Sequence, residues 1–285
     1  MHVFVTGATG YVGSAVVREL IGAGHTVTGL CRSEEKAAGL KAAGAEALYG
    51  TLDDLDTLRS AAAAADGVIH LAFTSTNDFS DFEGAVALDL RVVEAVGAAL
   101  EGSGKPFITT GHPHENGHTV DHAVLAMAER GIRASIVTPS PSVHGEGDRA
   151  FVPMLINIAR EKGFAAYIGD GTNRWPAVHH LDAAVLYRLA LESAPAGSQL
   201  LGAGDVGIPF REIAEVIGRQ LNVPTVSITP EEAAAHFGFL GPIAAFDLAG
   251  VFNTAQWSLA TRELLGWKPM QPGLIADLEE GHYFA

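Results

Sequence analysis

The sequence has few residues that could cross-link the chain or bind a polyanion. A single cysteine, Cys31, excludes an intramolecular disulfide and the cysteine-rich zinc modules. Only 18 lysines and arginines stand against 33 acidic residues, which gives a formal net charge of −15. Because nucleic-acid binding depends on cationic side chains at the phosphates, we expect no nucleic-acid partner.

Long apolar runs and a hydrolase nucleophile motif are also missing. No uncharged apolar stretch approaches the ~18 residues that a membrane helix requires, so we expect no membrane association. No Gly-x-Ser-x-Gly sequence is present, which removes support for a Ser-His-Asp hydrolase. The first residues, MHVFVTGATG, lead directly into a strand and a glycine turn without the pattern of a signal peptide. We therefore expect a cytoplasmic protein.

What the chain does contain is an alternation of short apolar segments with alanine-rich helical stretches. The β-rich segments of the first half lie at 2–6, 25–32, 45–50, 66–73, 105–110 and 132–138. Apolar strands alternating with helices predict a parallel sheet that is covered on both faces. After Thr138 the segments become shorter and more varied, which predicts a smaller C-terminal lobe.

The turn after the first expected strand carries the clearest functional signal. In VFVTGATGYVGSAVV, Gly7, Gly10 and Gly13 stand between that strand and a helix expected over 11–23. Such glycines allow a tight turn, let a pyrophosphate approach the backbone, and direct a helix N-terminus at its charge. The sequence therefore predicts a dinucleotide site that also includes Thr9, Tyr11 and Val12.

The end of the second expected strand distinguishes between the two nicotinamide dinucleotides. A carboxylate at this position hydrogen-bonds the ribose 2′-OH of NAD, but this chain reads Leu-Cys-Arg-Ser and has no acid before Glu34. The guanidinium of Arg32 matches a 2′-phosphate, and Ser33 and Lys36 lie beside it. We therefore predict NADP(H) as the cofactor, while a solvated surface arginine is the simpler alternative.

Together these motifs resemble those of the extended short-chain dehydrogenases/reductases, which include NAD-dependent epimerases/dehydratases and dihydroflavonol-reductase-like enzymes. The resemblance covers nearly the whole chain. It is carried by TGATGYVGS, GVIHLAF, PSVHGEGD, WPAVHHLDAA, PFREIAEVIG and LGWKP. It implies a doubly wound Rossmann α/β fold with a smaller C-terminal substrate lobe.

The resemblance also implies a domain organisation and further site residues. We expect the dinucleotide-binding domain over 1–147, with 174–195 returning to it, and the substrate lobe mainly over 148–285. A homodimer through the two long helices that flank the fifth strand is implied as well. The remaining cofactor-binding residues implied in this way are Leu52 and Asp53 at the adenine turn, Leu71, Ala72 and Phe73 after the fourth strand, Thr109 after the fifth, and Pro139 and Ser142 after the sixth.

One element of the family pattern is missing. Members that oxidise alcohols or reduce ketones use a serine or threonine, a tyrosine, and a lysine four residues after the tyrosine. Thr110 matches the first of these, but none of the five tyrosines is followed by a lysine at that spacing. The segment TTGHPHENGHTVDH, residues 109–122, occupies the place of the missing pair, and we expect its helix to begin at Thr119 as N-cap.

Three interpretations of this histidine-rich segment stay open. In the first, His112, His114 or His118 replaces the lost proton donor, since an imidazole titrates near neutral pH. In the second, histidines one helical turn apart bind a metal, although such dinucleotide enzymes need none and we predict no metal site. In the third, the segment is a solvated loop and catalysis is weakened or lost. Strand-end histidines His144, His179 and His180 are weaker candidates for substrate contact.

The sequence thus predicts an NADP(H)-dependent reductase that moves hydride to a small organic C=N, C=O or conjugated substrate. The catalytic residues assigned are Thr110, His112, His114 and His118. A non-redox lyase or isomerase on the same fold is one alternative, and a cofactor-binding sensor or interaction protein without catalysis is another.

Overall fold

The computed structural model describes residues 1–73, 81–111 and 118–284, apart from the side chains of His118 and Pro242. It separates into two compact units. Unit 1 comprises Met1–Thr138, Ala183–Leu200 and Glu263–Trp267, and unit 2 comprises Pro139–Asp182, Leu201–Arg262 and Lys268–Ala285. The chain thus passes between the units several times, and the predicted functional assignment of the two lobes stays a prediction.

Unit 1 is built around a seven-stranded sheet in the order β10-β6-β5-β4-β1-β2-β3. Its strands are β1 (His2–Thr6), β2 (Thr26–Cys31), β3 (Glu46–Tyr49), β4 (Gly67–His70), β5 (Pro106–Thr110), β6 (Arg133–Pro139) and β10 (Gln199–Gly202). The neighbouring pairs from β3 to β6 are all parallel. The central strands are almost entirely buried, as continuous apolar strands require when helices cover both faces.

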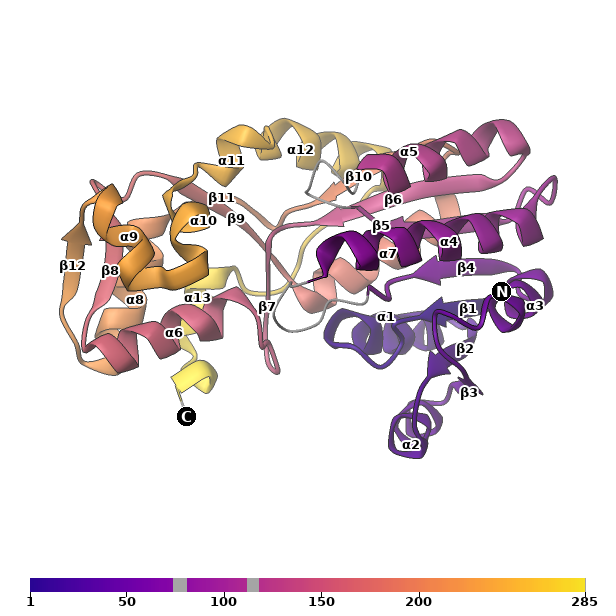
Figure 1. Ribbon diagram of the computed structural model, residues 1–285, viewed down its shortest axis with the longest axis horizontal. Helices are drawn as coiled ribbons and strands as arrows, with labels where there is room; N and C mark the ends of the chain where they lie inside the picture. The colour runs from indigo at the N-terminus through magenta and orange to yellow at the C-terminus, as the bar shows by residue number, and fades with distance from the viewer. Residues whose placement is uncertain (74–80, 112–117, 285) are drawn as a thin grey trace. The chain divides into compact units, whose positions relative to one another are not determined.

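Helices lie on both sides of this sheet (Figure 1). They are α1 (Tyr11–Gly22), α2 (Glu34–Ala42), α3 (Leu55–Ala64), α4 (Phe82–Leu100), α5 (His118–Ala126) and α7 (His180–Ser193), with a 3-10 turn, η2, at Met127–Arg130. The predicted doubly wound fold is confirmed. The strand order reverses between β1 and β4, which is where such sheets bind ligands at the carboxyl ends of their strands.

One local prediction was wrong by two residues. We expected Thr119 to cap the helix after the histidine-rich segment, but α5 begins at His118 and Thr119 lies inside it. Neither residue has a neighbouring proline to fix the boundary, and short polar residues such as threonine are tolerated in a first helical turn. His118 therefore belongs to a helix rather than to the preceding loop.

Unit 2, the smaller of the two, has two small sheets packed with helices. A three-stranded sheet has the order β11-β9-β7, and a two-stranded sheet pairs β12 with β8. The strands are β7 (Ser142–His144), β8 (Ala165–Ile168), β9 (Arg174–His179), β11 (Asp205–Pro209) and β12 (Thr225–Ile228). Strands β7 and β9 are parallel, with His144 opposite His179.

The helices of unit 2 bury its apolar side chains against these sheets. They are α6 (Phe151–Lys162), α8 (Phe210–Leu221), α9 (Pro230–Phe237), α10 (Gly241–Ala245), α11 (Leu248–Val251), α12 (Thr254–Leu265, which ends in unit 1) and α13 (Leu274–Glu279), with 3-10 turns η3 (Gly238–Leu240) and η4 (His282–Phe284). The core centres on Trp175 and Phe210, whose ring centroids lie 4.9 Å apart. Over the described ranges, no helix has the length and apolar character needed to cross a membrane.

Candidate functional site

The turn after β1 requires glycine at two of its three glycine positions, Gly7 and Gly13. Gly7 has a φ of +67°, and a Cβ there would lie 2.7 Å from the backbone nitrogen of Ala72. A Cβ on Gly13 would lie 1.9 Å from the carbonyl oxygen of Gly7. The first glycine thus lets the turn pass close to the end of β4, and the third lets α1 pack on the turn.

The N-terminus of α1 is open toward an anion. Gly10 is the N-cap residue, so no side chain caps the helix, and the first turn contains no acidic residue. The helix dipole adds to the partial positive charge of the backbone N–H groups in the first turn, which favours an anion at this end of the helix. Thr9, Tyr11 and Val12 are only partly buried here, so the predicted residues of this turn lie together.

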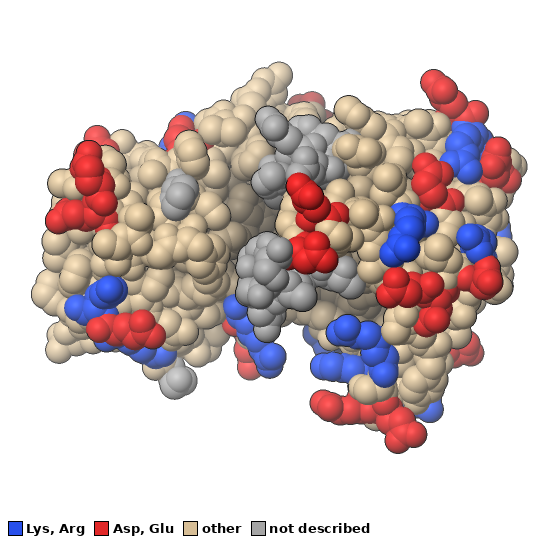
Figure 2. Space-filling model, viewed as in Figure 1, with Lys and Arg blue, Asp and Glu red and all other residues tan. Residues whose placement is uncertain are grey.

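The residues predicted to recognise a 2′-phosphate gather where β2 meets α2. Arg32 is exposed directly after β2, and Lys36 is exposed on α2. The hydroxyl of Ser33 is the helix N-cap and accepts a hydrogen bond from the backbone N–H of Lys36 at 3.3 Å. Basic side chains gather beside α2, with acidic side chains next to them (Figure 2). Two acids, Glu34 and Glu35, lie in the first turn of α2.

The turn before α3 is held by an acid that sequence reasoning missed. Leu52 is buried and Asp53 is exposed, with a guanidinium nitrogen of Arg91 3.4 Å from its carboxylate. Asp54 instead holds the turn, since its carboxylate accepts hydrogen bonds from the backbone N–H of Thr51 at 2.7 Å and from the hydroxyl of Thr51 at 3.0 Å. These bonds, the backbone one first, lower the pKa of Asp54. A threonine followed three residues later by an acid was the available signal.

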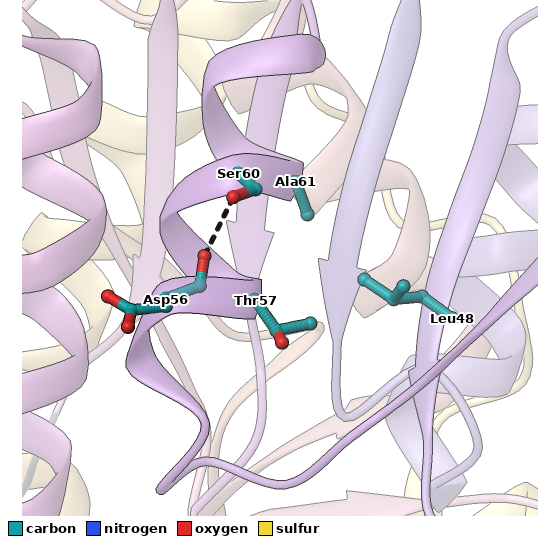
Figure 3. Close-up of a pocket in the computed structure, with 5 residues that line it drawn as sticks. All are labelled: Leu48, Asp56, Thr57, Ser60 and Ala61. Atoms are coloured by element: carbon teal, nitrogen blue, oxygen red, sulfur yellow. Dashed lines mark hydrogen bonds between the residues drawn. The ribbon is translucent and has the colours of Figure 1, made fainter.

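A shallow hollow lies on the outer side of the same helix. It is lined by Leu48, Asp56, Thr57, Ser60 and Ala61, and the hydroxyl of Ser60 donates to the carbonyl oxygen of Asp56 (Figure 3). None of the predicted cofactor residues lines it, and we assign it no function.

Three buried side chains connect the end of β4 to the glycine turn. His70 Nε2 lies 2.7 Å from a carboxylate oxygen of Asp89, and His70 Nδ1 lies 2.5 Å from the hydroxyl of Thr6. A carboxylate only accepts, so in the neutral imidazole Nε2 carries the proton and Nδ1 accepts from Thr6. The oxygen of Thr6 then accepts from the backbone N–H of Ala72 at 3.3 Å. This Thr6–His70–Asp89 relay fixes the backbone against which Gly7 packs.

The predicted residues beyond β4 lie beside this relay. The backbone N–H of Leu71 donates to the carbonyl oxygen of Thr6 at 3.3 Å, which continues the ladder from β1 past the end of β4. The ring of Phe73 lies 5.8 Å from that of Phe82 at the start of α4. Leu71, Ala72 and Phe73 are each partly exposed, and their place beside the cofactor stays a prediction.

The end of β5 brings Thr110 to a buried tyrosine. The hydroxyl oxygens of Thr110 and Tyr187 lie 2.8 Å apart, and burial raises the pKa of Tyr187 above its ordinary value. Tyr187 is fully buried, so its hydroxyl is not exposed to a substrate as a catalytic tyrosine would be. Thr109, one residue earlier, is also buried, and its hydroxyl has no hydrogen-bond partner within the described ranges.

Residues 7–171 match the model of a family that is described as NAD(P)H-binding. The chain belongs to the NAD(P)H-binding family. The match begins at the first glycine of the turn and includes every predicted cofactor residue.

Curated relatives extend over most of the chain. An uncharacterised protein of Schizosaccharomyces pombe is 46% identical, with 100% of both chains covered. The 4-hydroxy-2-methyl-3-oxo-4-farnesyl-3,4-dihydroquinoline-1-oxide ketoreductase of Stigmatella aurantiaca is 27% identical over 84% of this chain and 80% of its own. The 2-alkyl-3-oxoalkanoate reductase of Stenotrophomonas maltophilia is 24% identical over 79% and 77%.

Solved structures share the fold. A dTDP-glucose 4,6-dehydratase of Streptomyces venezuelae, solved with NAD bound, has a TM-score of 0.72 at 17% identity, with 99% of this chain and 96% of that chain covered. The family match, the ketoreductase relative and the shared fold together confirm the predicted resemblance to the extended short-chain dehydrogenases/reductases. The NAD(P)H-binding family and its reductase relatives make this chain an NAD(P)-dependent oxidoreductase.

The predicted catalytic histidines stay untested. His112 and His114 lie outside the described residues, and of His118 only its place at the start of α5 is described. Pro139 and Ser142 belong to unit 2, where Ser142 opens β7. The hydroxyl of Ser142 is buried and has no hydrogen-bond partner within residues 1–73, 81–111 and 118–284.

Proposed function

We propose that this member of the NAD(P)H-binding family is an NADPH-dependent reductase of small activated ketones. The observation that carries the cofactor assignment is the exposed Arg32 at the end of β2, where no carboxylate stands to bind a ribose 2′-OH. The open N-terminus of α1 and the glycines beside it fit the pyrophosphate of the dinucleotide. The bound cofactor would supply the hydride.

The substrate class follows from the missing tyrosine and from two relatives. Without a Tyr/Lys pair, a carbonyl that needs little help from a proton donor is favoured. Both the Stigmatella ketoreductase and the Stenotrophomonas reductase carry a 3-oxo group in the names of their substrates. A ketone beside an electron-withdrawing group is more electrophilic than a simple ketone, so we propose 2-alkyl-3-oxo esters and related activated ketones.

The residues in this proposal have separate roles. Arg32, with Lys36 and Ser33 nearby, binds the 2′-phosphate, and the turn from Gly7 to Gly13 binds the pyrophosphate. Thr110 lies at the end of β5, where a reductase of this type holds the carbonyl oxygen. We propose that the proton comes from the histidine-rich segment, through His112, His114 or His118.

The test is an assay of NADPH oxidation at 340 nm with ethyl 2-methylacetoacetate, and with acetone as the unactivated control. The proposal expects turnover of the ester with NADPH, little with NADH, and little with acetone. Replacing His112, His114 and His118 together by alanine is expected to lower kcat by about 10²-fold or more while NADPH binding is kept. Oxidation of NADH at the same rate would contradict the assignment of NADPH as the cofactor. No loss of rate in the triple variant would contradict the assignment of the histidines as proton donors.

A further inference from the structure

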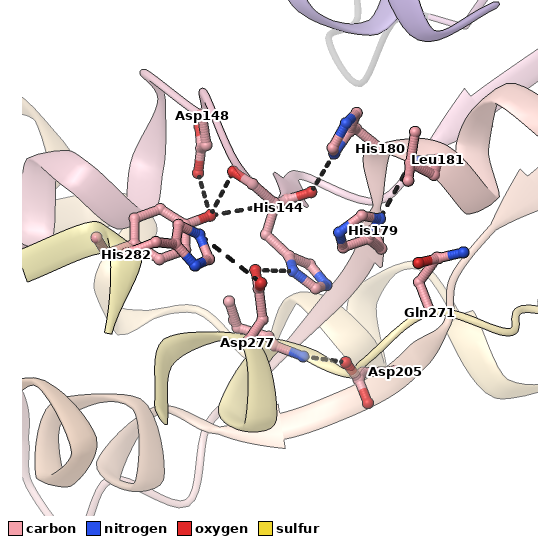
Figure 4. Close-up of polar contacts among 12 residues, drawn as sticks. His144, Asp148, His179, His180, Leu181, Asp205, Gln271, Asp277 and His282 are labelled. Atoms are coloured by element: carbon pink, nitrogen blue, oxygen red, sulfur yellow. Dashed lines mark hydrogen bonds and ion pairs between the residues drawn. The ribbon is translucent and has the colours of Figure 1, made fainter. Parts of the chain in front are cut away.

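A group of histidines in unit 2 has no role in the proposed cofactor site. His144 ends β7, His179 ends β9, and His180 opens α7, so the three imidazoles lie at the carboxyl ends of two parallel strands (Figure 4). His144 and His179 are opposite one another in the strand register. The carboxyl ends of parallel strands are where α/β proteins place functional side chains.

The orientation of His144 is fixed by a buried carboxylate. Its Nδ1 lies 2.7 Å from a carboxylate oxygen of Asp277 on α13, and both side chains are at most 4% exposed. Its backbone carbonyl accepts from His180 Nδ1 at 3.2 Å. Because the carboxylate only accepts, the neutral ring carries its proton on Nδ1 and presents Nε2 as a bare acceptor.

That acceptor is buried without a partner. In the part of the chain that the structure describes, no protein group donates to His144 Nε2. An unsatisfied buried polar atom costs on the order of 1–3 kcal/mol, so native proteins seldom keep one without an occupant that satisfies it. Ser142 lies two residues earlier and therefore on the same face of β7. Its hydroxyl is also buried and has no hydrogen-bond partner among the described residues.

The neighbouring His179 supplies the complementary donor. Its Nδ1 accepts from the backbone N–H of Leu181 at 3.2 Å, so in the neutral ring Nε2 carries the proton. Burial and the adjacent imidazoles, His180 foremost, lower the pKa of His179 to about 4, which keeps it neutral. The rings of His144 and His179 point toward one another, edge to face, with centroids 5.3 Å apart (Figure 4).

Gly145 keeps the space beside these rings free of side-chain atoms. It has a φ of +126°, and a Cβ there would lie 2.8 Å from His179 Nε2 and 2.3 Å from His180 Nδ1. Any other residue would place a carbon against the donor of His179. The glycine of His144-Gly145 is therefore required by the imidazoles themselves.

We propose that His144 and His179 form a binding site for one hydroxyl group of an organic ligand. The hydroxyl donates its proton to His144 Nε2 and accepts from His179 Nε2–H, so a single oxygen satisfies both rings. Asp277 acts as a positioning residue, because it sets which nitrogen of His144 is free. The inference rests on the proposed function only in using the alcohol product of the reductase as the probe.

The test compares two esters that differ by one hydroxyl. Wild-type protein, with histidine imidazoles ¹⁵N-labelled, is titrated with ethyl 3-hydroxy-2-methylbutanoate and separately with ethyl 2-methylbutanoate. The proposal expects the hydroxy ester to shift the His144 and His179 signals, and to bind at least 10-fold more tightly than the ester without the hydroxyl. Equal affinity for the two esters, or no shift with either, would mean that the site holds only a buried water and would overturn the proposal.

A matched pair of variants tests the roles of the individual atoms. In His144→Asn the amide can still donate to Asp277 but offers no atom in place of Nε2, so affinity for the hydroxy ester should fall about 10-fold. His282→Asn is the control, because His282 also faces Asp277, at 3.7 Å, but lies outside the proposed site. Asp277→Asn, which still accepts from His144 Nδ1, should restore most of the binding that Asp277→Leu loses. Unchanged affinity in a folded His144→Asn protein would refute the assignment.

Loss of this binding and failure of the reductase proposal give different results. The esters are titrated without cofactor, so their signals do not depend on NADPH oxidation. Absence of NADPH binding would overturn the proposed function and leave the hydroxyl site standing. Normal NADPH turnover with equal affinity for the two esters would overturn the hydroxyl site and leave the proposed function standing.

Discussion

At the scale of single residues, we propose that Arg32 sets the preference of the protein for NADPH over NADH. Replacing Arg32 by alanine removes a charge-assisted hydrogen bond that is worth about 1.5–3 kcal/mol. The Kd for NADPH should therefore rise about 10- to 100-fold while the Kd for NADH hardly changes, as measured by nicotinamide fluorescence. Arg59→Ala is the control, because Arg59 is also exposed in unit 1 but pairs with Asp56. An equal loss for both dinucleotides would show that Arg32 contributes only general charge.

Two glycines of the same helix give opposite predictions. Gly13→Ala places a Cβ 1.9 Å from the carbonyl of Gly7, so the turn must distort, and NADPH affinity should fall at least 10-fold. At Gly22, in the last turn of α1, no described atom beyond the neighbouring residues and the helix backbone lies within 4 Å of the added carbon. Gly22→Ala should leave binding unchanged and stabilise the helix by up to about 1 kcal/mol. Urea unfolding and NADPH titration of both variants check this, and normal cofactor binding by Gly13→Ala would contradict the geometry.

At the scale of elements, α4 is joined to the glycine turn through the Thr6–His70–Asp89 relay. In Asp89→Leu the Nε2 proton of His70 loses its buried acceptor, so stability should fall by about 1–3 kcal/mol and NADPH affinity with it. Asp89→Asn keeps a carbonyl oxygen that can accept, and should recover much of the loss. Chemical denaturation with and without NADPH measures both effects. Equal stability of the leucine and asparagine variants would show that the relay does not hold the turn.

The ends of β7 and β9 make unit 2 sensitive to acid. The pKa of His179 is about 4 in the folded protein and near 6.5 when unfolded, so the unfolded chain binds more protons between these values. Above pH 6.5 His179 therefore does not reduce the free energy of unfolding, and this free energy declines as the pH falls from 6.5 toward 4. The melting temperature of His179→Gln should fall less than that of the wild type between pH 7 and pH 5, by a few degrees. Parallel melting curves of the two proteins across this range would rule out His179 as the cause.

At the scale of the whole molecule, the sequence predicted what is encoded locally. The alternation of strands and helices is visible in short stretches of sequence. The same is true of the glycine turn and of Arg32 at the end of β2. Residue pattern and spacing were therefore enough to predict these features. The extended short-chain dehydrogenase/reductase type followed from motifs such as GVIHLAF and PSVHGEGD. The sheet topology and the family match bear out the fold and the family, while the role of Arg32 stays a prediction.

Contacts between distant parts of the chain could not be predicted. Asp89 reaches His70 across 19 residues and Asp277 reaches His144 across 133, and no local spacing identifies either pair. Buried hydrogen bonds of this kind depend on which helix packs on which strand end. Asp54 differs from these pairs, since the local spacing Thr51-x-x-Asp54 was a signal for its hydrogen bonds to Thr51. The catalytic assignment of His112, His114 and His118 stays a prediction.

The central claim, that this oxidoreductase uses NADPH, is tested most directly by titrating the purified protein with NADPH and, separately, with NADH. Both the emission of its three tryptophans and that of the nicotinamide are followed. We predict micromolar binding of NADPH and binding of NADH that is at least 10-fold weaker. Equal or tighter binding of NADH would remove Arg32 from its assigned role, and no binding of either dinucleotide would contradict the cofactor site itself.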